Sequence, residues 1–141
     1  MTTVSHAFQF RLHSEYASAK NDVASLQFEH HVKNGWQLYE PRDYTAGFLV
    51  LLYAIFNCQH LYFRVNAAER GIQLTSADGF LTAVTDDQWH LQKLHIHFDA
   101  IQASGNAAEG DEDYIIERME HCPVSVNIKR PTDTKVTLRF L

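Results

Sequence analysis

Residues 46–71 read AGFLVLLYAIFNCQHLYFRVNAAERG, and this stretch decides the fold. It contains no proline and no cluster of turn residues, so nothing in it ends a helix before Gly71. Its apolar side chains recur at spacings of three and four residues, which is typical of one helical face. The members of that face are Leu51, Ala54, Ile55, Cys58, Leu61, Tyr62 and Val65. We predict a central helix over residues 46–70, with Thr45 as N-cap and Gly71 as C′ residue.

The first half of this helix is apolar on every side. Residues 48–56 read FLVLLYAIF and carry no charged side chain. This run is shorter than the roughly 20 residues that a bilayer span needs, so we expect a buried core helix and no membrane partner. A helix that is apolar all round has to be enclosed by other structure. We therefore expect a sheet to cover one side and a second subunit to add further cover.

The region before the helix, residues 1–40, alternates apolar and polar side chains as half-buried strands do. Phe10 and Leu12, for example, fall on one face of the first strand, and the polar residues between them fall on the other. Turn signals at residues 20–22 and 34–35 separate the strands. We predict an antiparallel hairpin or meander for this region.

The region after the helix predicts more strands and a second helical region. Residues 72–101 alternate again, with residues 78–79 as a turn between two strands. Acidic residues then favour a helical start, and we predict a second helical region over residues 109–128 with a helix that ends at Cys122. Alternation over residues 134–141 predicts a closing strand. This order of elements favours an α+β fold with antiparallel sheets.

The composition limits the classes of protein to consider. The chain has 141 residues, a length that fits one domain and leaves little room for two. Its net charge of -5 and its scattered lysines and arginines argue against a nucleic-acid partner. The N-terminus shows neither a basic nor an apolar signal region, so we expect a cytoplasmic protein with free thiols.

The two cysteines are the leading candidates for chemistry. Cys58 lies mid-helix on an apolar face, where free cysteine often serves as a small hydrophobe. Cys122 precedes Pro123, a residue favoured at the first position of a helix, so Cys122 becomes the N-cap of a short turn that favours a thiolate. A buried residue at a helix end is the plainer interpretation of Cys122. His60 and His121 are near the cysteines in sequence, and each is a candidate for tuning a thiol.

A metal site is a further possibility for chemistry. His95 and His97 share one face of a strand, and Asp99 extends that face. Zinc needs three or four such ligands with a supporting shell of hydrogen bonds. The polar face of a solvated sheet explains the same alternation without a metal. The six glycines form no phosphate-binding loop, and no cofactor is expected.

Residues 121–125 read HCPVS, which resembles the Cys-Pro-Val-Ser signature of the OsmC/Ohr family. That family comprises the osmotically inducible protein C and organic hydroperoxide resistance proteins. The resemblance extends over about residues 40–141, because Cys58 lies mid-helix and the helix ends in ERGI at residues 69–72, as in the family. It implies an intertwined homodimer whose central helices are buried between two sheets.

The resemblance also implies a thiol peroxidase that acts in oxidative stress defence. Cys58 would attack an organic hydroperoxide as a thiolate and become a sulfenic acid, with release of an alcohol. Cys122 would resolve this sulfenic acid as a disulfide, which an external dithiol would reduce. An apolar surround would suit alkyl hydroperoxides better than hydrogen peroxide.

The chain departs from the family pattern in two places, at a glutamate and at the arginine that this glutamate holds. Family peroxidases carry a glutamate about three turns before the first cysteine, where this chain has Phe48. That glutamate holds an arginine that lowers the thiol pKa; here Arg42 is our first choice for such a cation and Arg11 the second. The missing carboxylate leaves open a catalytically weak or inactive OsmC-like protein that binds a small apolar ligand in the dimer cleft. A Cys58 pKa at or above its ordinary value of about 8.5 would favour that hypothesis.

Overall fold

The computed structural model describes residues 6–104, 107–128 and 139. The elements are β1 (His6–Ala17), β2 (Asp22–Val32), β3 (Gly35–Leu38), α1 (Gly47–Glu69), β4 (Gln73–Thr85), β5 (Leu91–Ser104), α2 (Asp111–Glu120) and α3 (Pro123–Ile128). The described strands form a five-stranded sheet in the order β3-β2-β1-β4-β5, in which every pair is antiparallel. The α+β class with antiparallel strands is confirmed. The closing strand expected over residues 134–141 falls almost wholly outside the described residues.

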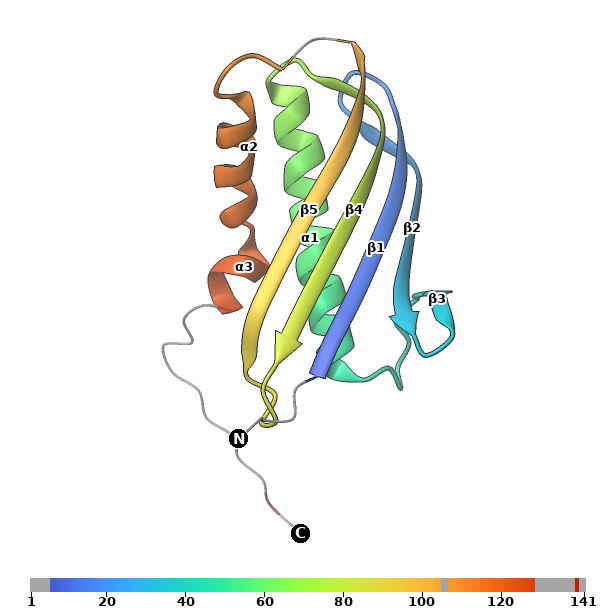
Figure 1. The fold of residues 1–141 in the computed structure, drawn as a ribbon. Helices are drawn as coiled ribbons and strands as arrows, with labels where there is room; N and C mark the ends of the chain where they lie inside the picture. The colour runs from blue at the N-terminus through green and yellow to red at the C-terminus, as the bar shows by residue number, and fades with distance from the viewer. Residues whose placement is uncertain (1–5, 105–106, 129–138, 140–141) are drawn as a thin grey trace.

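The helices lie on one side of this sheet (Figure 1). The alternation along β1 turns Phe10 and Leu12 toward α1, where they meet Leu52, Ile55 and Phe56. The same cluster takes in inward side chains from β2 and β4, and its other buried members are Phe28, Tyr39, Leu81 and Ala83. This core fixes α1 against the middle of the sheet and so determines which side of the helix is left for other contacts.

The first turn of α1 differs from the prediction by one residue. Ala46, not Thr45, occupies the N-cap position, and no side chain caps the helix. The Thr45 hydroxyl instead accepts a hydrogen bond from the Arg42 backbone N–H at 2.8 Å, which closes the preceding turn. The predicted N-cap was therefore wrong because threonine bonds to backbone in a turn as readily as at a helix start.

The last turn of α1 ends as predicted. Gly71 has φ of +74°, a conformation that costs glycine little. Its N–H donates to the Ala68 carbonyl at 3.0 Å, and the Ile72 N–H donates to the Ala67 carbonyl at 2.9 Å. These two bonds form the Schellman arrangement, with Gly71 at C′.

The turn predicted at residues 78–79 is wrong, since β4 runs through these positions without a break. Gly79 is buried, and a Cβ atom there would lie 2.7 Å from a ring carbon of Phe98 and 3.0 Å from Leu12 Cγ. The glycine thus allows a close approach of neighbouring side chains in mid-strand rather than a change of direction.

Asn21 joins three elements at the end of the sheet where β1 turns into β2. It is fully buried in the turn between β1 and β2, with φ of +56°. Its side-chain amide donates to the carbonyls of Arg64 and Ile72, each at 3.0 Å, and its Oδ1 accepts the Leu74 N–H at 2.8 Å. The turn, the end of α1 and the start of β4 are therefore held together by one polar side chain.

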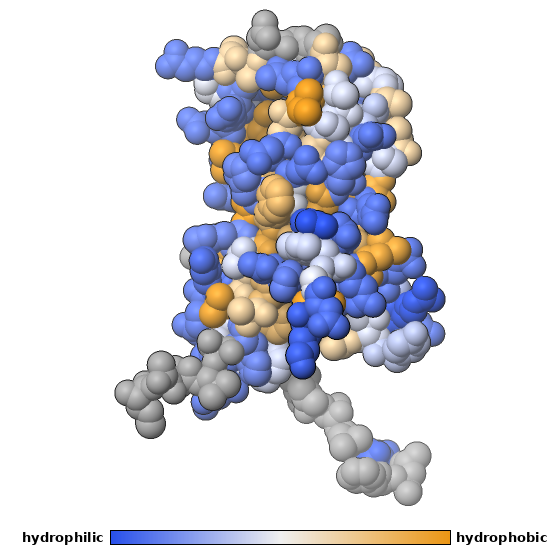
Figure 2. All heavy atoms as spheres, turned by 45° about the vertical axis from the view of Figure 1, so that its right-hand side comes forward, coloured by the Kyte–Doolittle hydropathy of each residue, from blue (hydrophilic) through white to orange (hydrophobic). Residues whose placement is uncertain are grey.

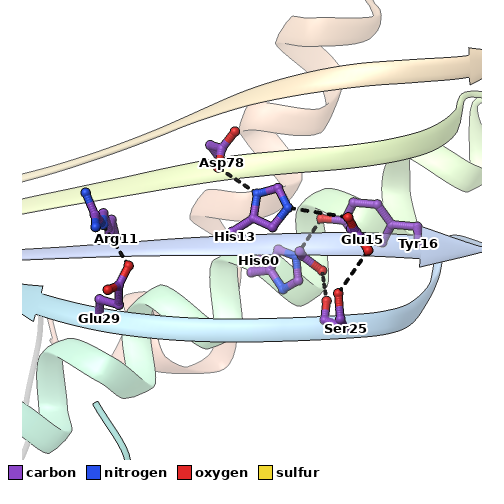
Figure 3. A network of polar contacts seen from close by, with 9 residues as sticks. Arg11, His13, Glu15, Tyr16, Ser25, Glu29, His60 and Asp78 are labelled. Atoms are coloured by element: carbon purple, nitrogen blue, oxygen red, sulfur yellow. Dashed lines mark hydrogen bonds and ion pairs between the residues drawn. The ribbon is translucent and has the colours of Figure 1, made fainter. Parts of the chain in front are cut away.

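The face of the sheet turned away from α1 is polar. Arg11 pairs with Glu29 at 2.9 Å, and His13 Nδ1 lies 2.8 Å from Asp78 Oδ1 (Figure 3). The hydrogen bond to Asp78 raises the pKa of His13 above its ordinary value. Figure 2, which brings the β2–β3 side forward, shows hydrophilic side chains over much of that side, with apolar ones between them. Polar-out alternation is thus the main organisation of this face.

The side of α1 that does not meet the sheet carries apolar side chains at spacings of three and four residues. We call this set the α1 stripe; it consists of Leu51, Ala54, Cys58, Leu61 and Val65. Its three largest aliphatic members, Leu51, Leu61 and Val65, are about 40% exposed in the single chain. Among the described residues, α1 is also the one helix long and apolar enough to span a membrane, a test that core helices of soluble proteins pass as well.

Candidate functional site: two cysteines between α1 and α3

Cys58 and Cys122 meet where α1 passes the start of α3. Cys58 lies in the middle of α1 and is partly buried, whereas Cys122 directly precedes α3 and is fully buried. Both are free thiols, and Cys122 lies close enough to Cys58 to raise its pKa. The structure thus brings together the two cysteines that the sequence singled out.

A break between two helices positions Cys122. The expected helical region contains α2, which ends at Glu120, and α3, which begins at Pro123. Proline has no N–H to continue the bonding of α2, but it suits the first position of a new helix. The Cys122 sulfur accepts the Ser125 backbone N–H at 3.3 Å, and its carbonyl accepts the Val126 N–H at 3.1 Å. Cys122 therefore occupies the N-cap position that the sequence predicted.

Two polar side chains at this site were not singled out from the sequence. The Cys122 thiol donates to Ser125 Oγ at 2.9 Å, and the Gln59 side-chain amide donates to the same oxygen at 3.1 Å. Ser125 is buried, like Cys122. The serine of the HCPVS segment was the available signal for Ser125; Gln59 had none, because its contact depends on how α1 and α3 approach each other.

The pKa of Cys58 is raised above its ordinary value in the single chain. The largest cause is burial, which disfavours the charged thiolate. The Val124 backbone N–H, which donates to the Cys58 sulfur, works in the opposite direction, and the neighbouring Cys122 raises the pKa further. Within one chain, then, Cys58 is held mainly as a thiol at neutral pH.

Neither arginine proposed as an activating cation contacts Cys58 among the described residues. Arg42 is exposed and pairs with Glu40 at 3.4 Å, before α1 begins. Cys58 lies about 16 Å further along the helix axis than Gly47, at about 1.5 Å per residue. Arg11 points to the outer face of the sheet, where it lies over the Trp36 ring at 4.3 Å. A role for Arg42 in activating Cys58 stays a prediction.

The two neighbouring histidines face away from the sulfurs. His60 is buried on the sheet side of α1, and its Nε2 shares a hydrogen bond of 2.7 Å with the Tyr16 hydroxyl (Figure 3). Burial lowers the pKa of His60 to about 4 and raises the pKa of Tyr16 to about 12, so both groups are neutral at pH 7. His121 hydrogen-bonds the Glu117 carbonyl within its own helix at 2.7 Å. Neither histidine therefore tunes a cysteine directly.

Phe48, at the position where the resemblance implies a glutamate, belongs to an aromatic cluster. Its ring centroid lies 5.2 Å from that of Phe8 and 5.6 Å from that of Trp89, the latter in an edge-on contact. The position therefore stabilises the contact of α1 with β1 and the β4–β5 loop. It does not offer a charge to Cys58.

The residues of the metal hypothesis lie on the outer face of the sheet. His97 Nε2 is 2.8 Å from Asp99 Oδ1, and both side chains are exposed. No group of three histidine, cysteine, aspartate or glutamate side chains within the described ranges is arranged to hold a metal ion. His95 and His97 thus lack the further ligand that zinc needs.

A cavity of about 470 Å³ lies between α2, β5 and the second half of α1. Its walls are mostly apolar, with Phe63, Phe98, Ile115 and Met119 among the lining residues. Glu112 of α2 and Asp99 of β5 are also among the lining residues. Met119 is three residues before Cys122, so the cavity reaches the helix that leads into the cysteine pair.

Comparisons with known proteins agree on one family. The family model described as OsmC-like protein matches residues 43–137. The fold is similar to the crystal structure of an OsmC-like hydroperoxide resistance protein from Jannaschia sp. CCS1, with a TM-score of 0.63 and 11% identity over 95% of this chain and 94% of that one. No curated protein matches this chain.

Proposed function

Because this chain belongs to the OsmC-like protein family, we propose that it is a cysteine-dependent peroxidase that reduces organic hydroperoxides in oxidative stress defence. The observation that carries the proposal is the contact between Cys58 and Cys122 across α1 and α3. Two neighbouring free thiols can give up two electrons to an oxidant and form a disulfide. The similar crystal structure, of a hydroperoxide resistance protein, supports the same class of activity.

In the first step the Cys58 thiolate attacks the outer oxygen of the hydroperoxide. A sulfur–oxygen bond forms as the oxygen–oxygen bond breaks, and the leaving alkoxide takes a proton to become an alcohol. Cys58 is the more accessible of the two sulfurs, and the Val124 N–H donates to it. This hydrogen bond favours the thiolate against the cost of burial.

In the second step the Cys122 thiolate attacks the sulfenic sulfur of Cys58. The disulfide forms, the sulfur–oxygen bond breaks, and the departing hydroxide becomes water with one proton. An external dithiol then reduces the disulfide by exchange. We place this cycle in the cytoplasm, with neither nucleic acid nor membrane as a partner.

A single-turnover experiment tests the proposal. Reduced protein is mixed with one equivalent of cumene hydroperoxide in the absence of other thiols, and free thiols and intact mass are followed. The expected result is the loss of both thiols with formation of one intramolecular disulfide per chain. Retention of both thiols, with the hydroperoxide unconsumed, would rule the peroxidase out.

We also propose that two chains associate through the α1 stripe. The stripe presents partly exposed aliphatic side chains at heptad-like spacings, a pattern that helices bury against other helices. Cys58 lies in the middle of the stripe, so a second chain seated there would cover the cysteine pair. Such a homodimer would enclose the half of α1 that the sheet leaves uncovered.

Charged substitutions in the stripe should separate the dimer. We expect Leu61→Glu and Val65→Glu to shift the protein from dimer to monomer, because a carboxylate in an apolar interface is costly to desolvate. Light scattering after size exclusion measures the mass. Gln27→Glu on the exposed part of β2 is the matched control and should leave the mass unchanged. A wild-type protein that is monomeric at all concentrations would contradict the dimer.

Two observations favour a second candidate function, a catalytically weak or inactive OsmC-like protein that binds a small apolar ligand. The raised pKa of Cys58 is the direction expected of an unactivated thiol. The apolar cavity between α2 and β5 offers space for a ligand of modest size, since binding pockets are typically several hundred Å³. Ligand binding there would need neither cysteine.

The pH dependence of Cys58 alkylation separates the two candidates. In a Cys122→Ser variant, we expect the rate of reaction with iodoacetamide to rise with pH up to a midpoint above about 8.5, since burial raises the pKa of Cys58. A midpoint below the ordinary value would contradict the direction found here and favour an activated peroxidase. A high midpoint in a protein that consumes no hydroperoxide would support the ligand-binding function.

A further inference from the structure

We propose that the Ser125 hydroxyl, held by the Gln59 amide, is a positioning group for Cys122 that controls its reactivity as the resolving thiol. The inference rests on the peroxidase cycle proposed above. Ser125 Oγ lies 2.9 Å from the Cys122 sulfur and 3.1 Å from Gln59 Nε2. Cys122 is 0% exposed and Ser125 is 4% exposed, so water does not replace these contacts.

The hydroxyl suits both protonation states of Cys122. A serine hydroxyl has one hydrogen and two acceptor positions. With Cys122 as a thiol, the S–H and the Gln59 amide fill the two acceptor positions. Once Cys122 loses its proton, the serine O–H can turn and donate to the thiolate without a change of separation. Gln59 keeps donating to the oxygen in both states and so holds it beside the sulfur.

The thiolate needs such donors because it forms in a buried place. Burial disfavours a charged sulfur unless a cation or hydrogen-bond donors offset the cost. Among the described residues, no lysine, arginine or histidine side chain hydrogen-bonds the Cys122 sulfur, whereas the Ser125 backbone N–H does so at 3.3 Å. The Ser125 side chain adds a second donor from the same residue. Two neutral donors thus take the part that a cation would otherwise play.

The effect belongs to the second step of the cycle alone. Cys122 attacks Cys58, the disulfide forms, and the group bound to the Cys58 sulfur leaves with the bonding electrons. The serine proton is shared with the attacking sulfur and stays on the serine oxygen at the end. Ser125 does not touch the hydroperoxide in the first step, so the rate of Cys58 oxidation should be independent of it.

The test measures resolution without a hydroperoxide. Cys58 is converted to a mixed disulfide with thionitrobenzoate, and attack by Cys122 releases the coloured thiolate at a measurable rate. We expect Ser125→Ala to slow this release by about tenfold, the worth of one hydrogen bond to a charged group, and to shift its pH midpoint upward. Ser125→Thr, which keeps the hydroxyl, should restore the rate. Gln59→Met should slow release by a smaller factor.

The outcomes separate this inference from the peroxidase itself. An equal release rate and pH midpoint in wild type and Ser125→Ala would overturn the positioning role, whatever the hydroperoxide assay shows. Slow release in Ser125→Ala together with rescue by threonine would support the role even if hydroperoxide were not consumed. Melting temperatures of all variants show whether they fold. If Ser125→Ala does not fold, Gln59→Met becomes the test variant, and an unchanged release rate in Gln59→Met would then overturn the role.

Discussion

Replacing Cys58 with serine is expected to lower hydroperoxide consumption to the rate measured without protein. Cys58 is the accessible sulfur of the pair, and its oxidation is the only route by which the proposed cycle begins. A serine hydroxyl in the same place has too high a pKa to attack the hydroperoxide. The measurement follows residual cumene hydroperoxide with dithiothreitol as reductant, over a range of pH because burial raises the pKa of Cys58.

Cys122→Ser is the matched control for this loss. In the single-turnover experiment without other thiols, this variant should still be oxidised at Cys58 but stop at the sulfenic acid, so one thiol is lost per hydroperoxide instead of two. Equal consumption by Cys58→Ser and wild type would show that Cys58 is not the attacking group. A melting temperature close to that of wild type in both variants confirms that the difference is chemical.

The largest expected change in stability comes from Phe56→Ala, at about 3–5 kcal/mol. Phe56 is 0% exposed in the core between α1 and the sheet. Its ring lies edge-on to Phe28 at 5.8 Å, and it also packs against Phe98. Without the ring this apolar surface is no longer buried, and a cavity remains because the neighbouring side chains, which come from different strands, cannot move in to fill it.

Urea denaturation at fixed protein concentration measures this loss, since association of chains makes apparent stability depend on concentration. Leu38→Ala is the control, because Leu38 on β3 is 49% exposed and should change the free energy of unfolding by no more than about 0.5 kcal/mol. A loss below about 1 kcal/mol for Phe56→Ala would contradict the assignment of this side chain to a close-packed core.

Local patterns predicted the elements well where one physical cause acted alone. The three-and-four spacing predicted the central helix, and Gly71 predicted its end, because a left-handed C′ residue favours glycine wherever it occurs. The turn predicted at residues 78–79 was wrong, since an Asp-Gly pair also occurs within a continuous strand. In this chain β4 continues, and the glycine serves the approach of Phe98 instead.

The candidate site was predictable only where local sequence patterns determine it. The HCPVS segment singled out Cys122, and its helix-start position followed from Pro123. Whether an arginine lies near Cys58 was not predictable. In the structure Arg11 lies over Trp36 on the outer face of the sheet and Arg42 pairs with Glu40, so neither contacts Cys58. No local pattern shows which of several cations comes within reach of a sulfur 16 or more residues away in sequence.

The sequence by itself determined that this chain forms a long apolar helix flanked by antiparallel strands, with a cysteine in the helix and another at a later helix start. These features follow from periodicity, glycine conformation and proline chemistry, which act over a few residues. The tertiary structure alone decided that the two sulfurs meet and that Gln59 and Ser125 share a hydrogen bond. Those contacts depend on how α1 is rotated about its axis against the sheet. The packing of the whole buried core determines that rotation.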